Sequence, residues 1–223
     1  MLCLSERSLL SLSPRHKVVL AIKSRQAFIS TLDSTHSYVE TILLRNCNLF
    51  ELTGLLDRSH QRGILVYVNV DHIDGIQPDI TGLHYLADRL HVTGIISSNP
   101  KTLALAKSIR LETIQRIFAL DSTGLESSLE SIDTQYIDLL EISPALAVPH
   151  IKPQLLSSLP LPFIASGLID TPAQIEAVLR SGALRIVVSR AELWQQAHAG
   201  YKQDSYRHLA RKGGEDTRTI SPT

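Results

Sequence analysis

The sequence has few of the features that stabilise small secreted domains or anchor a chain in a membrane. Its two cysteines, Cys3 and Cys47, have no spacing typical of a disulfide framework or a zinc site. No apolar run approaches the roughly 20 residues of a membrane span. Residues 1–17 contain Glu6 and Arg7 inside a broken apolar stretch, without the small-residue cleavage site of a signal peptide. We therefore expect a cytoplasmic protein.

An excess of charge of either sign is also absent. Lys+Arg and Asp+Glu number 22 each, whereas a dedicated nucleic-acid-binding domain is usually basic. Any contact with RNA must therefore come from a local patch. The chain also lacks a P-loop, a dinucleotide fingerprint and a Ser-His-Asp pattern, so no cofactor is expected.

What the sequence does contain is a regular alternation of short apolar runs with stretches of helical spacing. At 223 residues the chain has the length of one α/β barrel. The continuous apolar runs are typical of parallel strands that are covered on both faces, and they are residues 18–22, 41–44, 64–70, 94–97, 113–119, 137–142, 162–166 and 185–189. This alternation predicts an α/β fold, a (β/α)8 TIM-type barrel in a single domain. A doubly wound open sheet is the alternative, but it usually has a glycine-rich turn after its first strand.

The helices and the domain limits follow from the same pattern. Helical spacing covers residues 79–91, 100–110 and 171–182, the last with Thr171 as N-cap, Pro172 in the first turn and Gly182 as its end. We expect the barrel at residues 17–198, after a disordered or loosely packed N-terminal extension at residues 1–16. Residues 199–223 are polar, without apolar periodicity, and are expected to form a disordered tail.

Polar residues follow almost every predicted strand. Because barrels of this type bind ligands at the carboxyl ends of their strands, these residues are expected to meet at one mouth. They are Lys23, Arg45, Asn46, Asp71, His72, Asp74, Ser97, Ser98, Arg116, Glu141, Ser166, Gly167, Ser189 and Arg190.

The segments after the seventh and eighth strands suggest phosphate binding. Barrels often hold phosphate between these two loops with backbone N–H groups. Gly167 lets the backbone approach an anion closely, and Ser189 adds a hydroxyl donor. The alternative is that Gly167 only forms a tight turn.

The carboxylates near the mouth have several possible roles. Asp71 and Asp74 with His72 could bind a metal, although a polar pocket wall is the favoured interpretation. Glu141 lies in an apolar run and needs a partner, and we expect Arg116 to supply it as an ion pair. Asp71 and Glu141 could also act as a general acid and base.

Taken together, these segments resemble the glycerol-uptake operon antiterminator family, regulators that respond to glycerol 3-phosphate. The resemblance covers residues 18–194 and rests on VYVNVDHIDGI at 66–76, GIISS at 94–98, TIQRIFALDS at 113–122, IDLLEISPALAVPHI at 137–151, IASGLIDTPAQIEAVLRSGA at 164–183 and VVSRAELW at 187–194. It implies a barrel that binds glycerol 3-phosphate or a similar phosphorylated small molecule. The loaded protein would act on a leader mRNA so that transcription passes a terminator.

The resemblance also assigns roles to residues. The phosphate would be held by Ser166, Gly167, Leu168, Ser189 and Arg190, and the hydroxyls would be read by Asp71, Arg116 and Glu141. The chain departs from the family pattern at Asn69, Ala145, Ser166, Val187 and Val188. Ala145 replaces a glycine, so a rebuilt turn after the sixth strand is expected.

RNA contact would fall to the basic side chains Lys101, Lys107 and Arg110, which share one predicted helix. The alternative is a solvated helix face. Our leading hypothesis is a ligand-sensing RNA-binding regulator and not an enzyme. The second is a barrel isomerase, lyase or aldolase acting on a phosphorylated substrate, with Asp71 or Glu141 as base and Lys23 as nucleophile. The third is an interaction module that has lost its ligand.

Overall fold

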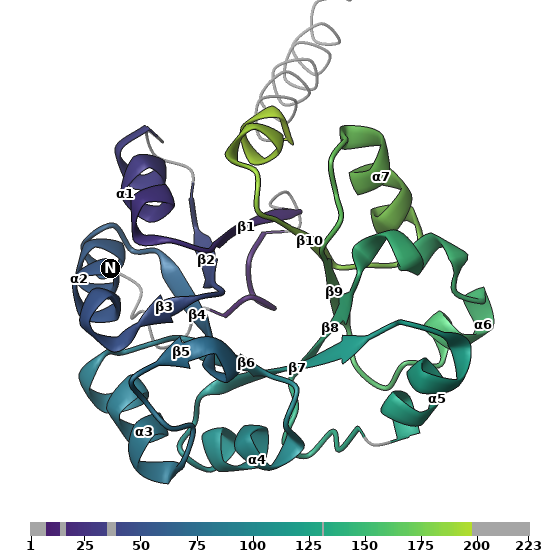
Figure 1. The fold of residues 1–223 in the computed structure, drawn as a ribbon. Coiled ribbons are helices and arrows are strands. Elements are labelled where there is room, and N and C mark those ends of the chain that lie inside the picture. Colours follow the sequence, from purple (N-terminus) through teal and green to yellow (C-terminus); the bar gives the residue numbers. More distant parts are fainter. Residues whose placement is uncertain (1–7, 14–16, 35–38, 131, 198–223) are drawn as a thin grey trace, which may run out of the picture.

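Eight parallel strands form a closed barrel in the computed structural model (Figure 1). The structure describes residues 8–13, 17–34, 39–130 and 132–197. The barrel strands are β1 (Val18–Ile22), β2 (Thr41–Leu44), β4 (Leu65–Asn69), β6 (Gly94–Ser97), β7 (Glu112–Phe118), β8 (Leu139–Ser143), β9 (Phe163–Ser166) and β10 (Arg185–Val188). They neighbour one another in chain order, and β10 closes the ring against β1. The predicted fold class is confirmed.

Helices surround the ring on its outside (Figure 1). They are α1 (Arg25–Ser34), α2 (Leu49–Gln61), α3 (Ile80–His84) with its π-helical continuation η3 (Tyr85–Arg89), α4 (Pro100–Ser108), α5 (Ser122–Glu130), α6 (Pro153–Ser157) and α7 (Pro172–Arg180), together with the 3-10 segments η2 (Val70–His72) and η4 (Ala145–His150). A two-stranded parallel sheet of β3 (Cys47–Asn48) and β5 (Ile73–Asp74) lies beside the mouth. This small sheet was not expected from the sequence.

Local sequence signals explain where α7 begins and ends. The Thr171 side chain accepts a hydrogen bond from the Gln174 backbone, and the Gln174 side chain accepts one from the Thr171 backbone. This reciprocal capping box satisfies two of the free N–H groups of the first turn. After the helix, Gly182 has a φ of 101°, the left-handed region that favours glycine.

Alternate residues of each strand point into the barrel. One cluster of buried residues fills the interior, and it includes Leu43, Tyr67, Ile114, Leu139 and Ile164. A larger cluster packs between the strands and the helices. Because the side chains of a strand alternate, the residues two positions further along each strand also point inward, at the carboxyl-end mouth of the barrel.

Residues 8–13 close the opposite, amino-terminal end. Leu9 is 0% exposed, and it belongs to the interior cluster together with Leu12. The Leu9 N–H donates to the Tyr67 hydroxyl, which donates to Glu112. The buried Arg185 guanidinium donates to the carbonyls of Leu9, Leu12 and Ser13.

This packing corrects one prediction. The sequence suggested a disordered or loosely packed extension over residues 1–16, but residues 8–13 are fixed to the barrel because Arg185 inside the base needs the carbonyl oxygens that they supply. Residues 1–7 and 14–16, and the predicted tail from residue 199, lie outside the described residues. Within the described ranges, each helix is too short or too polar to cross a membrane.

We predict that Leu9→Ala lowers the free energy of unfolding by about 2–5 kcal/mol, because it removes a fully buried side chain from the barrel base. Urea unfolding measures the change. Leu10→Ala is the matched control, since Leu10 is 41% exposed. Equal losses for the two variants would contradict the packing of residues 8–13.

Candidate functional site

The mouth of the barrel is lined by polar side chains that the strand alternation turns inward. Each of these side chains follows a residue of the interior cluster by two positions, so it points to the same side of its strand. They are Arg45 beyond β2, Asn69 at the end of β4, Arg116 on β7, Glu141 on β8 and Ser166 on β9. Arg45, Asn69, Glu141 and Ser166 are all buried. The barrel therefore changes from an apolar interior to a polar layer within one step along each strand.

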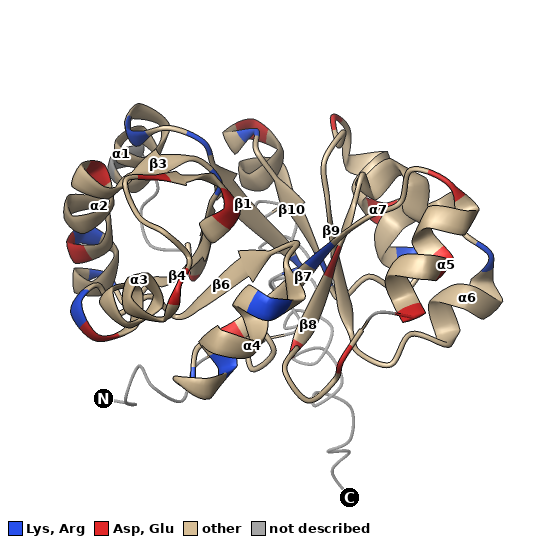
Figure 2. Cartoon of the chain, turned by 60° about the horizontal axis from the view of Figure 1, so that its bottom comes forward, with Lys and Arg blue, Asp and Glu red and all other residues tan. Residues whose placement is uncertain are grey.

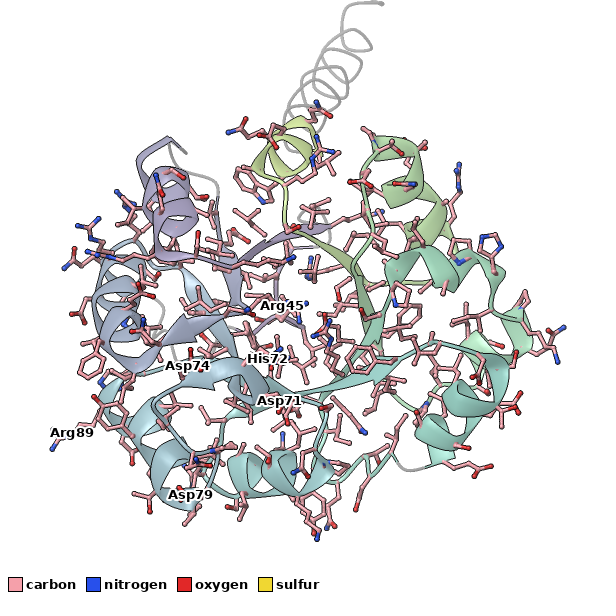
Figure 3. The ribbon with its side chains drawn as sticks, viewed as in Figure 1. Arg45, Asp71, His72, Asp74, Asp79 and Arg89 are labelled. Carbon is pink, nitrogen blue, oxygen red and sulfur yellow. The ribbon has the colours of Figure 1, made fainter. Side chains whose placement is uncertain are left out.

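A buried ion pair crosses this layer. The two terminal nitrogens of Arg45 bind the two carboxylate oxygens of Glu141, with Nη1 donating to Oε2 over 3.0 Å. The strands β2 and β8 lie four places apart in either direction around the ring of eight, so the pair connects opposite walls. Figure 3 shows Arg45 inside the ring of strands.

This pairing corrects the predicted ion pair of Glu141 with Arg116. The two residues are neighbours on β7 and β8, but the Arg116 side chain is longer than the gap of about 4.8 Å between adjacent strands. It extends past the carboxylate toward the mouth, where its Nη2 donates to Ser143 Oγ over 3.4 Å. Its guanidinium carbon lies 4.8 Å from the centre of the Phe118 ring, a cation–π distance. Arg45 extends from the opposite wall, so its two terminal nitrogens face the two carboxylate oxygens of Glu141.

The charge state of Glu141 follows from this contact. Burial acts to raise the pKa of Glu141, but the charge and hydrogen bonds of Arg45, with help from Ser166 and Arg116, outweigh burial and hold the pKa below 4.5. Glu141 is therefore ionised at neutral pH, and Arg45 occupies both of its oxygens. Such a carboxylate is a poor general base.

Asp71 is also engaged within the protein. Its carboxylate accepts hydrogen bonds from Ser97 Oγ at 2.6 Å, from the Ser98 N–H at 2.7 Å and from Ser98 Oγ at 2.8 Å. These bonds connect the ends of β4 and β6. Asp71, His72 and Asp74 form no group suited to a metal ion, and neither do other acidic, histidine or cysteine side chains in the described ranges.

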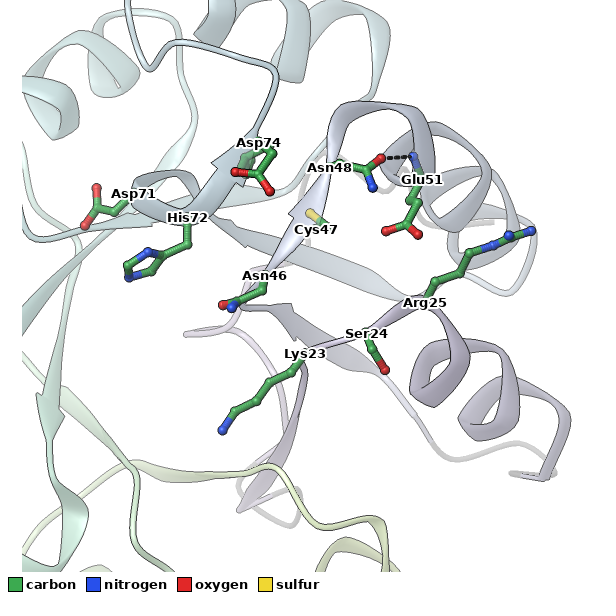
Figure 4. A pocket seen from close by; sticks show the side chains of 11 residues that line it. Lys23, Ser24, Arg25, Asn46, Cys47, Asn48, Glu51, Asp71, His72 and Asp74 are labelled. Carbon is green, nitrogen blue, oxygen red and sulfur yellow. Dashed lines mark hydrogen bonds between the residues drawn. The ribbon is translucent and has the colours of Figure 1, made fainter.

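A polar pocket of about 440 Å³ opens beside the barrel axis, between the ends of β1 and β2 and the small β3–β5 sheet. Lys23, Asn46 and His72 extend from three different segments to the same side of it (Figure 4). Burial, together with the charges of Glu51 and Asp74, raises the pKa of the Cys47 thiol to about 11. Cys47 is therefore protonated and unreactive at neutral pH.

The turns after β9 and β10 are exposed and adjacent. Gly167 has a φ of 92° and Leu168 a φ of 59°. None of the hydrogen bonds found in the described turns is donated by the backbone N–H groups of Gly167, Leu168, Ser189 or Arg190. The Arg190 side chain lies 3.5 Å from Asp170 and so connects the two turns. The two turns therefore lie side by side at the mouth, with an exposed backbone at Gly167, Leu168, Ser189 and Arg190.

Ala145, where a glycine was expected, lies in the turn after β8. Ala145 is buried, begins the 3-10 segment η4, and its N–H donates to the Gly167 carbonyl over 3.1 Å. It is not among the residues with a positive φ. An added Cβ at Gly167 would lie 3.3 Å from Ser143 Oγ, so the turns after β8 and β9 pack closely against each other.

The three basic residues predicted to contact RNA do not form one patch. Lys101 lies at the start of α4, whereas Arg110 lies beyond its end with a φ of 66°. The helix separates them by roughly 13 Å at 1.5 Å per residue. Lys107 forms an ion pair with Asp138. The basic positions on α4 therefore lie near its two ends, and α2 carries both acidic and basic positions (Figure 2).

Sequence reasoning missed the roles of two residues. Arg45 was recognised as polar, but its contact with Glu141 requires knowledge of which strands face each other across the barrel. Asn69 was noted only as a departure from the family. Its Oδ1 accepts a hydrogen bond from the Asp71 N–H, and its Nδ2 is buried without a partner. Its position two residues after Tyr67 was the signal that could have placed it in the mouth.

Comparisons with known proteins identify a family and a shared fold. A family model described as "Glycerol-3-phosphate responsive antiterminator" matches residues 18–194. The chain is similar to the glycerol uptake operon antiterminator regulatory protein of Listeria monocytogenes, with 23% identity, a TM-score of 0.73, and coverage of 80% of this chain and 95% of that one. An antiterminator-related protein of Thermotoga maritima gives 23% identity, a TM-score of 0.68, and coverage of 80% and 97%.

Enzymes with the same barrel are also similar in structure. Orotidine 5′-phosphate decarboxylase of Pyrococcus horikoshii has 14% identity and a TM-score of 0.58, with coverage of 83% of this chain and 98% of that one. At these identities the structural likeness establishes the fold alone. Curated protein sequences give no match.

We predict that Arg45→Met lowers the free energy of unfolding at neutral pH by about 3–5 kcal/mol, because it leaves Glu141 as a buried charge without its partner. Urea unfolding at pH 7 measures the loss. Arg25→Met, which removes an exposed arginine, is the matched control. A loss no larger than that of the control would contradict the ion pair.

The same pair predicts a pH dependence. The pKa of Glu141 is lower in the folded protein than its ordinary value of 4.5, so between these two values the unfolded chain binds more protons. The stability that the pair contributes is complete above pH 4.5 and is lost as the pH falls through the folded pKa. Glu141→Gln is expected to remove this component from the wild-type profile of unfolding free energy against pH. An unchanged acid limb in the variant would contradict a lowered pKa of Glu141 in the folded protein.

Proposed function

This chain belongs to the glycerol-3-phosphate responsive antiterminator family, and we propose that it is a ligand-responsive regulator of transcription rather than an enzyme. It binds glycerol 3-phosphate or a similar phosphorylated small molecule at the barrel mouth. In the bound state it acts on a leader mRNA in the cytoplasm and so regulates genes of glycerol utilisation.

The observation that carries the proposal is the pair of adjacent turns after β9 and β10. The N–H groups of Gly167, Leu168, Ser189 and Arg190 have no acceptor among the hydrogen bonds of the described turns, and backbone N–H groups in this position suit a phosphate. Ser166 lies directly below them, and Arg190 adds a positive charge. These five residues are the proposed phosphate site, and the ligand extends from them toward Asp71 and Arg116 and over Glu141.

An enzymatic role has less support from the same residues. Glu141 is ionised and bound to Arg45, and Asp71 accepts three hydrogen bonds. Neither carboxylate is therefore poised to take a proton from a substrate. Turnover of a phosphorylated three-carbon compound by the purified chain would favour the enzymatic alternative.

We predict that Gly167→Ala abolishes the stabilisation of the protein by glycerol 3-phosphate. The added methyl group strains a backbone with a φ of 92° and occupies space beside the proposed anion. At 100-fold excess over the dissociation constant, wild-type protein should gain about 2.7 kcal/mol, measured by chemical unfolding with and without the ligand.

Gly54→Ala is the matched control, because Gly54 is an exposed residue of α2 with no atom near its absent Cβ. It should keep the full effect of the ligand. If wild-type protein gains no stability from glycerol 3-phosphate or any other phosphate ester, the proposed sensor is wrong.

The binding of RNA is the least specified part of the proposal. Of the three basic residues considered, Lys101 and Arg110 are exposed, whereas Lys107 is paired with Asp138. We predict that Lys101→Gln together with Arg110→Gln weakens binding to a leader transcript. The slope of log affinity against log salt should become shallower by about 0.7 for each RNA phosphate that the variant no longer neutralises. Filter binding with saturating ligand measures both quantities.

Arg62→Gln is the control for this experiment, since Arg62 is exposed near the end of α2. An affinity that is the same in the double variant and in the control would exclude these two residues from the RNA site. A wild-type protein that shows only weak, salt-independent retention of the transcript would contradict RNA binding itself.

A further inference from the structure

The ring of strands sets where the far end of a bound ligand lies. Strands β4 and β6 are directly opposite β9 and β10 in the ring of eight. The interior of an eight-stranded barrel is about as wide as the side chains that fill it, so a three-carbon ester can span the mouth. A ligand whose phosphate is held by the turns after β9 and β10 therefore points its other end toward β4, β6 and the neighbouring β7.

The unpartnered groups at that far end are hydrogen-bond donors. Arg116 Nε on β7 and Asn69 Nδ2 on β4 are both buried without a hydrogen-bond partner. Arg116 has only one long hydrogen bond, to Ser143 at 3.4 Å, and it forms no ion pair with the described acidic residues. A buried donor without an acceptor is costly, and a ligand oxygen would supply the missing partner.

The carboxylates in the same layer already accept hydrogen bonds from donors of the protein. Arg45 binds both oxygens of Glu141, and Asp71 accepts three hydrogen bonds from Ser97 and Ser98. A terminal hydroxyl of the ligand could accept from Arg116, but it brings no charge to the guanidinium, and its own proton would share the carboxylate oxygens with donors of the protein. A carboxylate has acceptor positions only, and it would give Arg116 a charged partner.

Resting on the proposed function, we propose that the ligand carries a carboxylate at the end opposite its phosphate. The chain then senses a phosphorylated three-carbon hydroxy acid in preference to glycerol 3-phosphate. Arg116 is the residue that determines this specificity, with Asn69 as a second donor. Arg45 is a positioning residue, because its positive charge neutralises the Glu141 carboxylate, which would otherwise repel the acid.

The test is titration calorimetry of the full chain with three probes, 3-phosphoglycerate, glycerol 3-phosphate and inorganic phosphate. We expect 3-phosphoglycerate to bind about tenfold more tightly than glycerol 3-phosphate, the ratio that one charge-assisted hydrogen bond supports. In Arg116→Gln this ratio should fall to near one, because the affinity for 3-phosphoglycerate falls more than the affinity for glycerol 3-phosphate.

Two further variants keep the result interpretable. Arg116→Lys retains the positive charge and should retain a preference for the acid even if Arg116→Gln folds poorly. Arg62→Gln removes an exposed arginine at the end of α2 and should leave all three affinities unchanged.

The possible failures are distinct. Glycerol 3-phosphate that binds as tightly as the acid, or a preference that survives in Arg116→Gln, overturns this inference and leaves the proposed function standing. If none of the three probes binds, the proposed function fails and the inference fails with it.

Discussion

The bond between Arg45 and Glu141 determines the character of the barrel mouth. It joins strands on opposite walls, and it lies directly above the apolar interior that Leu43 and Leu139 help to fill. A carboxylate that is 0% exposed is tolerated only because a guanidinium matches both of its oxygens. The same contact leaves Arg116 without a carboxylate partner, so the polar layer presents donors to the space above it.

The two ends of the barrel meet the same physical requirement in different ways. At the base, the buried Arg185 is solvated by backbone carbonyls of residues 8–13, while at the mouth Arg45 is neutralised by a side chain. The base is thereby closed by the chain itself. The mouth stays open, with exposed turns after β9 and β10 whose N–H groups lack acceptors in the described turns. The strand ends therefore define the side from which a ligand reaches the polar layer.

The spacing of apolar residues, together with the residues that begin and end helices, was sufficient to predict the fold. Each of the eight apolar runs became a barrel strand, because parallel strands that are covered on both faces are mostly apolar and stand out from the helices between them. The partner of Glu141 could not be predicted in this way. Arg116 is closer in sequence and adjacent in the sheet, but the length of its side chain favours contact further along the strand. Residues 8–13 were mispredicted for a related reason, since Arg185 gives no local sign of where its acceptors lie.

The family assignment and the geometry of the mouth lead to one central claim, that an anionic ligand binds above an ion pair that remains intact. A crystal structure of the chain with 3-phosphoglycerate or glycerol 3-phosphate tests this claim most directly. We predict phosphate oxygens within hydrogen-bond distance of the Gly167 and Ser189 N–H groups, with Arg45 still bound to Glu141. A ligand hydroxyl bound to Glu141, with Arg45 turned away, would contradict the account.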